Sequence, residues 1–175
     1  MKKYLKISFA IIFLFLLGFL GYQFANQLKH KNAIAENIRE IPAFSFETMD
    51  GKMFTKAHLD SQKATVFIFF NSECDYCQHE AQDIQNHVED FHETQFIFVS
   101  VEDKDRIRKF SETYQLSHYD FIHFARDPSG SFITTFDANS IPFLLIYNRE
   151  GKLVEKIKGQ TKAENILKKL ALSQD

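Results

Sequence analysis

The chain has 175 residues, enough for one ordinary domain and an appendage. Hydrophobic residues make up 45% and charged residues 25% of it, which is ordinary for a globular protein. The net charge of −2 gives no reason to expect a nucleic-acid-binding protein, and the 20 phenylalanines predict a core rich in Phe.

Three lysines precede an apolar segment, Ile7 to Phe24, that contains no charged residue. As a helix this segment spans about 27 Å, close to the thickness of the hydrocarbon layer of a bilayer. A cleaved signal peptide is the alternative, but the small residues of a cleavage site do not follow the segment. We therefore expect residues 1–24 to be a cytoplasmic stub and a transmembrane signal-anchor. The rest of the chain would lie in a periplasmic or outer-face compartment, which tolerates disulfides.

Residues 25–40 are mostly polar and form the expected juxtamembrane spacer, which Pro42 ends. Residues 41–175 are then predicted to form one folded domain. Two short runs flank Asp50-Gly51, which is a strong local signal for a β-hairpin over residues 44–55. Residues 65–70 are apolar without alternation, as expected of a central strand covered on both faces.

The remaining pattern alternates helices with strands. Apolar residues at helical spacing predict a helix over about residues 75–91. The further predicted elements are strands at 94–101, 121–125, 143–147 and 152–157, helices at 103–114 and 131–136, and a last helix opened by a capping box, Thr161 to Glu164. This order predicts an α/β sandwich with a mixed sheet.

The two cysteines of the chain, Cys74 and Cys77, stand between the predicted central strand and the helix that follows it. A Cys-x-x-Cys in this position is typical of a redox site. Unpaired N–H groups and the dipole at a helix N-terminus favour a thiolate, so Cys74 is the predicted nucleophile. Cys77 lies one turn further in and can resolve a mixed disulfide, so the two are predicted to form a redox-active disulfide.

Two alternatives compete with a redox pair. A structural disulfide across so short a loop restrains the unfolded chain little. A metal site needs further ligands, and the sequence offers neither a second cysteine pair nor a closely spaced histidine pair. We therefore predict no metal site and no organic cofactor.

The motif Cys74-Asp75-Tyr76-Cys77 after an apolar strand, with Ile141-Pro142 opening a later strand, resembles the thioredoxin fold. The hairpin, Glu80, the N-terminal anchor and residues 147–152 are similar to those of the membrane-anchored TlpA/ResA-like thiol-disulfide oxidoreductases. This resemblance covers about residues 41–172. It implies a thioredoxin-like three-layer α/β sandwich with a mixed sheet and an N-terminal hairpin, preceded by one transmembrane helix.

The resemblance also implies that Pro142 is a cis-proline packed beside the cysteine pair, where it turns the preceding backbone toward a substrate peptide. A trans proline that starts a strand is the alternative. Tyr76, Ile141 and Phe143 flank the predicted site and are its candidate substrate-binding residues. Tyr76 and Phe143 could equally be surface and core aromatics.

Glu80 matches an acidic residue that some of these reductases carry after the motif. A carboxylate one turn below Cys77 can accept the proton of Cys77 during attack on the mixed disulfide. Glu80 and Pro142 therefore join the two cysteines as predicted catalytic residues. A solvated helix glutamate is the alternative for Glu80.

Negative charge near the first cysteine sets this chain apart from the family. Glu73 stands where the family commonly has Trp, and Asp75 and Glu80 add two further acids. Their charges are expected to oppose the helix dipole at Cys74. A less stabilised thiolate makes a less oxidising disulfide, so we predict a reductase.

The predicted function is an extracytoplasmic thiol-disulfide oxidoreductase acting on protein disulfides. Apocytochrome c in cytochrome c maturation is one candidate substrate, and the oxidised enzyme needs a transmembrane electron donor. A copper-binding metallochaperone on the same fold is the alternative. Its cysteines would have three residues between them, whereas Cys74 and Cys77 have two, and His118 or His123 would have to complete its site. A peroxidase of the peroxiredoxin type would need a Thr where Asn71 stands.

Overall fold

The computed structural model describes the backbone of residues 2–173 and the side chains of residues 15–29 and 31–173. The chain divides into two compact units, Met1–Asn37 and Ile38–Asp175. Each unit is considered by itself.

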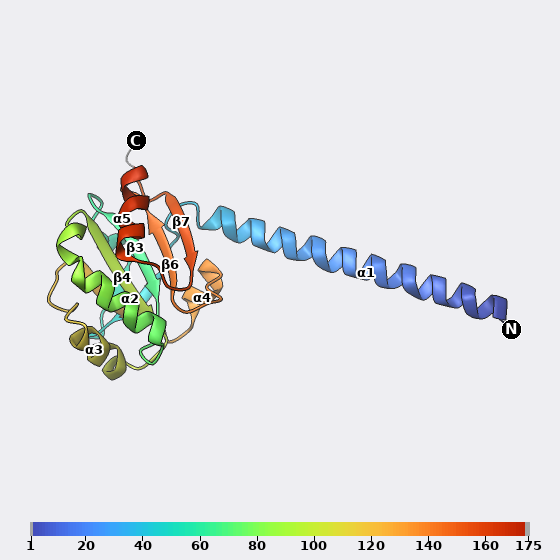
Figure 1. Ribbon diagram of the computed structural model, residues 1–175, viewed down its shortest axis with the longest axis horizontal. Coiled ribbons are helices and arrows are strands. Elements are labelled where there is room, and N and C mark those ends of the chain that lie inside the picture. The colour runs from blue at the N-terminus through green and yellow to red at the C-terminus, as the bar shows by residue number, and fades with distance from the viewer. Residues whose placement is uncertain (1, 174–175) are drawn as a thin grey trace. The chain divides into compact units, whose positions relative to one another are not determined.

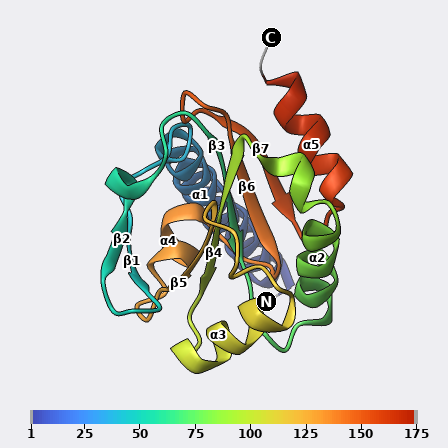
Figure 2. The same cartoon turned by 90° about the vertical axis from the view of Figure 1, so that its left-hand side faces the viewer.

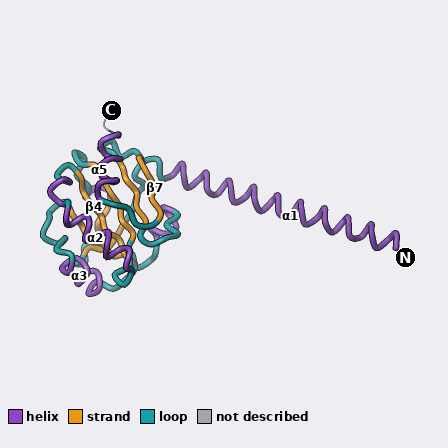
Figure 3. Tube along the Cα trace, in the orientation of Figure 1, coloured by secondary structure: helices purple, strands orange, loops and turns teal. Residues whose placement is uncertain are grey.

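The first unit contains one helix, α1, Lys2–Asn37 (Figure 3). The predicted membrane segment, Ile7 to Phe24, extends outside the residues whose side chains are described. Within the described part of the chain, no helix combines the length and the apolar character that a membrane span requires.

The second unit is an α/β fold (Figure 1). Its strands are β1 Ser45–Thr48, β2 Met53–Thr55, β3 Ala64–Phe69, β4 Thr94–Ser100, β5 Ile122–Arg126, β6 Phe143–Tyr147 and β7 Leu153–Lys158. Its α-helices are α2 Asp75–Asn86, α3 Lys104–Thr113, α4 Ser131–Phe136 and α5 Ala163–Leu172, and two 3-10 turns are η1 Lys56–His58 and η2 Val88–Phe91. The predicted helix over residues 75–91 is thus α2 followed by η2.

Among the described residues the strands form one 7-stranded sheet in the order β2-β1-β5-β4-β3-β6-β7. Strands β3, β4 and β5 are parallel to one another, whereas β1, β2, β6 and β7 pair antiparallel with their neighbours. The predicted mixed sheet and the N-terminal hairpin are therefore confirmed.

Strand β3 lies in the interior of this sheet, between β4 and β6, and its six residues are all buried. Because side chains alternate along a strand, Val66 and Ile68 pack with residues of α2, α3 and α5, whereas Phe67 and Phe69 pack against aromatic rings of α4. Figure 2 shows α4 on one side of the sheet and α2 and α5 on the other. The prediction of a central strand covered on both faces, within three layers, is confirmed.

The folded unit begins at Ile38, slightly before the predicted start at residue 41. Ile38 and Ile41 are 2% and 5% exposed, and the Tyr147 hydroxyl donates a hydrogen bond to the Ile38 carbonyl (3.2 Å). The end of the polar segment thus packs into the domain core.

Phe67 is expected to be a main contributor to stability. Its side chain is 0% exposed, and the centroid of its ring lies within 6.3 Å of the ring centroids of Phe44, Phe132, Phe136 and Tyr147. Phe67→Ala should lower the free energy of unfolding by about 3–5 kcal/mol, because it removes a buried ring and leaves a cavity. Urea unfolding measures this effect. Met53→Ala, at a half-exposed position, serves as control and should cost about 0.5 kcal/mol or less.

Candidate functional site

The cysteine motif lies where β3 passes into α2. Helix α2 begins at Asp75 and has Cys74 as its N-cap. A tight turn at Asn71 places Cys74 at the start of the helix. In this turn the Cys74 N–H donates to the Asn71 carbonyl (3.2 Å), and the Glu73 N–H donates to Asn71 Oδ1 (2.9 Å). Both cysteines are in the thiol form, Cys74 partly exposed and Cys77 buried. This is the predicted placement of the pair at a helix N-terminus.

Cys77 is poorly suited to be the attacking thiol. It is 2% exposed, and burial raises the pKa of its thiol far above the usual range, with the negative charges of Cys74 and Glu80 adding to that shift. A hydrogen bond from the Asn71 backbone opposes the shift but does not outweigh it. Exposure therefore favours Cys74 as the predicted attacking thiol, and a buried thiol such as Cys77 needs a proton acceptor in order to react.

The segment around Pro142 meets the cysteine motif in space. The peptide bond between Ile141 and Pro142 is cis, as the resemblance implied. The Cys74 Sγ lies 3.9 Å from the Ile141 carbonyl oxygen. Ile141 is 42% exposed, and Tyr76 in the first turn of α2 is 64% exposed. Ile141 and Tyr76 are thus available for contact with a partner beside Cys74.

The prediction that Phe143 binds substrate is wrong for its side chain. Phe143 is 0% exposed and packs edge-on against Phe132 of α4, with the Lys156 ammonium over its ring. As the first residue of β6 it points to the α4 face of the sheet. Phe143 is therefore a core aromatic, the alternative that the sequence left open.

Glu80 is a buried carboxyl and not a solvated one. Its side chain is 1% exposed, and its Oε1 accepts a hydrogen bond from the Thr161 N–H (3.0 Å). Its Oε2 is a buried polar atom that has no hydrogen-bond partner within the described residues. Burial raises the pKa of Glu80 to about 8, the Thr161 N–H opposes this, and the charge of Asp83 raises it further.

Glu80 and Cys77 are coupled groups. They are three residues apart on α2, so they lie on the same face of the helix. The charge of ionised Glu80 raises the pKa of the Cys77 thiol. In its ionised form, a carboxyl with a pKa of about 8 is a stronger base than an ordinary glutamate, so Glu80 remains the predicted acceptor of the Cys77 proton.

The expected acidic frame around Cys74 is only partly present. Glu73 forms an ion pair with Arg106 (2.8 Å), and Glu80 is largely protonated at neutral pH because of its raised pKa. Of the three acids, only Asp75 is both exposed and without a cationic partner within the described residues. The charge argument for a reductase is therefore weaker than the sequence suggested, because the neutralising Arg106 lies far away along the chain.

Glu102 is a residue of the site that sequence reasoning missed. Its side chain is 8% exposed and accepts two hydrogen bonds from Ser72, one from the N–H and one from the hydroxyl, both 2.7 Å. Arg106 lies 3.4 Å from Glu102 and so joins it to Glu73. One signal could have found Glu102: it follows strand β4, whose carboxyl end lies beside that of β3.

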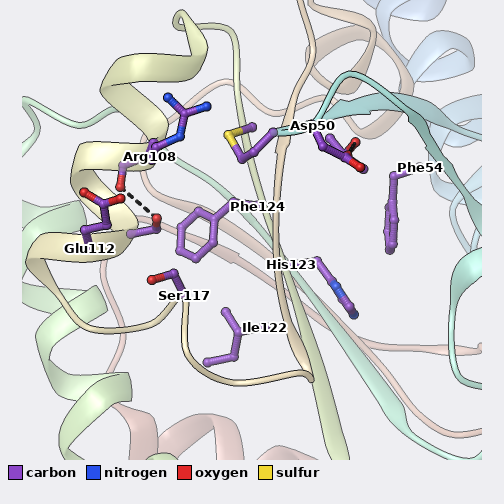
Figure 4. A pocket seen from close by; sticks show the side chains of 11 residues that line it. Asp50, Phe54, Arg108, Glu112, Ser117, Ile122, His123 and Phe124 are labelled. Carbon is purple, nitrogen blue, oxygen red and sulfur yellow. Dashed lines mark hydrogen bonds between the residues drawn. The ribbon is translucent and has the colours of Figure 1, made fainter.

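Two cavities lie on different sides of α3. One of about 380 Å³ borders the cysteine segment and is lined by Ser72, Glu73, Gln78, Arg106, Lys109, Phe110, Thr113 and Tyr114. The other, of about 460 Å³, contains none of the predicted catalytic residues. Figure 4 shows Arg108 and Glu112 of α3 on one side of it and His123 facing Phe54 on the other.

The structure gives no support to a copper site at the cysteines. His123 packs against Phe54, with ring centroids 5.1 Å apart, and lines the cavity that lacks the cysteines. His118 is exposed between α3 and β5. Within the described residues, no group of three or more His, Cys, Asp or Glu side chains could hold a metal ion.

Comparison with known proteins agrees with this geometry. A model described as the AhpC/TSA family matches residues 38–158, more than half of the chain. The chain belongs to the AhpC/TSA family. Its thioredoxin-like fold and its class, an oxidoreductase, are thereby confirmed. No curated protein matches the chain.

Solved structures share the fold of this AhpC/TSA family member at low sequence identity. A secreted disulfide oxidoreductase of Mycobacterium tuberculosis, described as homologous to E. coli DsbE, is 18% identical over 78% of this chain and 98% of its own, with a TM-score of 0.62. StoA from Bacillus subtilis is 16% identical over 73% and 95%, with a TM-score of 0.57. Peroxidoxin BcpB from Mycobacterium tuberculosis is 15% identical over 76% and 94%, with a TM-score of 0.65.

Proposed function

We propose that this chain is a membrane-anchored, extracytoplasmic thiol-disulfide oxidoreductase of the TlpA/ResA-like kind that reduces protein disulfides. One observation carries the proposal. Cys74 is partly exposed beside the Ile141 carbonyl, while Cys77 is buried on the same helix as the buried carboxyl of Glu80. An attacking thiol, a resolving thiol and a proton acceptor are the groups that two-step thiol-disulfide exchange needs.

The reaction begins at Cys74. Its thiolate attacks one sulfur of a substrate disulfide, so a Cys74–substrate disulfide forms and the other substrate sulfur leaves and takes up a proton. Cys77 then transfers its proton to Glu80 in its ionised, carboxylate form and attacks Cys74 Sγ; Glu80 later releases this proton to solvent. The second substrate sulfur leaves as a thiolate and is protonated, and Cys74 and Cys77 become a disulfide. Two electrons and two protons pass from the enzyme to the substrate.

The surface at Cys74 suits an extended peptide. The exposed side chains of Tyr76 and Ile141 offer apolar contact, and the backbone at Ile141 offers a hydrogen-bonding edge. The cavity that borders Ser72 and Glu73 can take a side chain of the same peptide. A protein disulfide in a flexible segment therefore fits the site, and apocytochrome c is one such substrate.

A dithiol donor must return two electrons to the oxidised pair after each turnover. The predicted anchor, Ile7 to Phe24, would hold the domain outside the membrane and close to a transmembrane donor. The enzyme would then work as a reductase in a compartment where disulfides otherwise persist.

Reduction of insulin by the full-length chain in detergent micelles, with dithiothreitol as electron donor, tests the proposal. The wild type should accelerate reduction well above the rate with dithiothreitol alone, and Cys74→Ser should return it to that background, because the attacking sulfur is lost. Hydrogen peroxide and Cu(I) are offered in parallel. Rapid peroxide consumption, or stoichiometric Cu(I) binding, by a chain that leaves insulin oxidised would refute the proposal.

A further inference from the structure

Two carboxylates of α2 hold the start of α5. Glu80 Oε1 accepts from the Thr161 N–H (3.0 Å), and Asp83 Oδ2 accepts from the Ala163 N–H (2.6 Å). Glu80 is buried, whereas the side chain of Asp83 is 30% exposed. Since the two acids are three residues apart on α2, one face of that helix contacts one short segment, residues 161–163.

Asp83 caps the N-terminus of α5. The predicted capping box, Thr161 to Glu164, is not formed: α5 begins at Ala163, and its N-cap Lys162 makes no side-chain hydrogen bond. The first N–H groups of a helix have no partner within the helix, so another group must satisfy them. Asp83 supplies a carboxylate there, where the positive end of the helix dipole also favours a negative charge.

The segment held by Asp83 also contacts two predicted catalytic residues. At one end, the Gly159 N–H donates to the Pro142 carbonyl (2.9 Å), and in the middle the Thr161 N–H donates to Glu80. At the other end Asp83 fixes Ala163. Residues 159–163 therefore join the Pro142 turn, the buried carboxyl and α5, with Asp83 as the side chain that ties them to α2.

We propose that Asp83 is a positioning residue for the reaction: its bond to Ala163 fixes the segment whose Thr161 N–H orients Glu80 toward its role as acceptor of the Cys77 proton. This inference rests on the proposed function, in which Glu80 receives the Cys77 proton.

The electrostatics agree with this geometry. Besides burial, Asp83 is the group whose charge raises the pKa of Glu80, and the Thr161 N–H acts in the opposite direction. Cys77 and His87 are titratable neighbours of the two acids on α2 and at its end, and Glu164 in the first turn of α5 acts electrostatically on His87. The segment that leads to α5 carries two further charged residues, Lys158 and Lys162. His87 Nδ1 lies 3.7 Å from Asp83 Oδ1, and the two lysines are exposed.

The test is a single turnover with 5,5′-dithiobis(2-nitrobenzoate), an aromatic disulfide that releases a coloured thiolate. The reduced full-length chain in micelles is mixed with one equivalent of it. Attack by Cys74 releases the first thiolate, and resolution by Cys77 releases the second. The rate of the second release, measured from pH 6 to pH 10, reports the titration of Glu80.

Two Asp83 variants separate charge from structure. Asp83→Asn keeps an oxygen that can accept from Ala163 but removes the charge, so the inflection of the second release should move to lower pH while the plateau rate stays within about twofold. Asp83→Ala should move the inflection in the same direction and also lower the plateau, because the Ala163 N–H loses its acceptor. Glu89→Gln, at an exposed position in η2, is the control and should leave the profile unchanged.

An Asp83→Asn profile that coincides with wild type, or that moves to higher pH, would overturn the inference. A purely structural role would lower the midpoint of urea unfolding in Asp83→Ala without moving the inflection in either variant, which would also overturn it. A wild-type chain that releases only one thiolate would instead overturn the proposed function, since Cys77 would then not resolve the mixed disulfide.

Discussion

A Glu80→Gln variant should resolve a mixed disulfide on Cys74 on the order of 100-fold more slowly than wild type at pH 8, because it has lost the base that takes the Cys77 proton. Gln has nearly the same shape as Glu and keeps an oxygen that can accept from Thr161, so the segment 159–163 should stay in place. The second thiolate release in the single-turnover assay measures the effect.

The first thiolate release serves as an internal control in that experiment. Attack by Cys74 does not use Glu80, so its rate should change by less than about twofold. Glu89→Gln, at an exposed position in η2 just beyond α2, tests whether loss of any nearby carboxylate slows the reaction and should not do so. Equal second-release rates in wild type and Glu80→Gln would show that the buried carboxyl is not the proton acceptor.

The same substitution should make the protein more stable at neutral and alkaline pH. Folding raises the pKa of Glu80 from its usual 4.5 to about 8, so between these values the folded state binds more protons than the unfolded state. The free energy of unfolding of the wild type therefore falls as pH rises through this window. Between pH 4.5 and pH 7 the loss from this one group is on the order of 3 kcal/mol.

Urea unfolding of both proteins at several pH values checks this sign. Glu80→Gln cannot ionise, so its advantage over wild type should be small near pH 4.5 and grow toward pH 8. Asp83→Asn should show a smaller effect in the same direction, since Glu80 would still ionise inside the protein. A difference between wild type and Glu80→Gln that does not depend on pH would mean that the carboxyl is solvated in solution.

Local patterns predicted most of the fold. An unbroken apolar run predicted β3, and Asp50-Gly51 predicted the hairpin of β1 and β2. These two elements could be predicted because each is determined by residues that are neighbours in the sequence. The capping box at the start of α5 failed for the opposite reason. Asp83 satisfies the Ala163 N–H from another helix, 80 positions earlier in the chain.

In the candidate site, too, the features set by neighbouring residues could be predicted, and those set by distant residues could not. Cys74 at the helix N-terminus follows from the motif and its place after a strand, and the resemblance correctly placed the cis bond before Pro142. Phe143 was assigned to the wrong environment, because a strand buried on both faces shows no alternation that tells one face from the other. Whether the Phe143 side chain is exposed or buried depends on the face of the sheet toward which it points after the turn at Pro142.

Charge around the cysteines could not be predicted from the sequence either. Glu73 appeared as an unpaired acid next to Cys74, yet Arg106 of α3 lies against it. Glu102 looked like one of many surface acids, yet it anchors Ser72 beside the motif. Both contacts join β3 or its following turn to the segment after β4, and only the three-dimensional arrangement of parallel strands brings these segments together.

Capture of the reaction intermediate tests the central claim most directly. Full-length Cys77→Ser in micelles, mixed with insulin, should form a covalent adduct that reductant removes and that a Cys74→Ser, Cys77→Ser double variant does not form. Since the chain has no other cysteine, the adduct identifies Cys74 as the attacking sulfur and Cys77 as the one that resolves. A Cys77→Ser chain that forms no adduct, or a Cys74→Ser chain that still reduces insulin at the wild-type rate, would contradict the account.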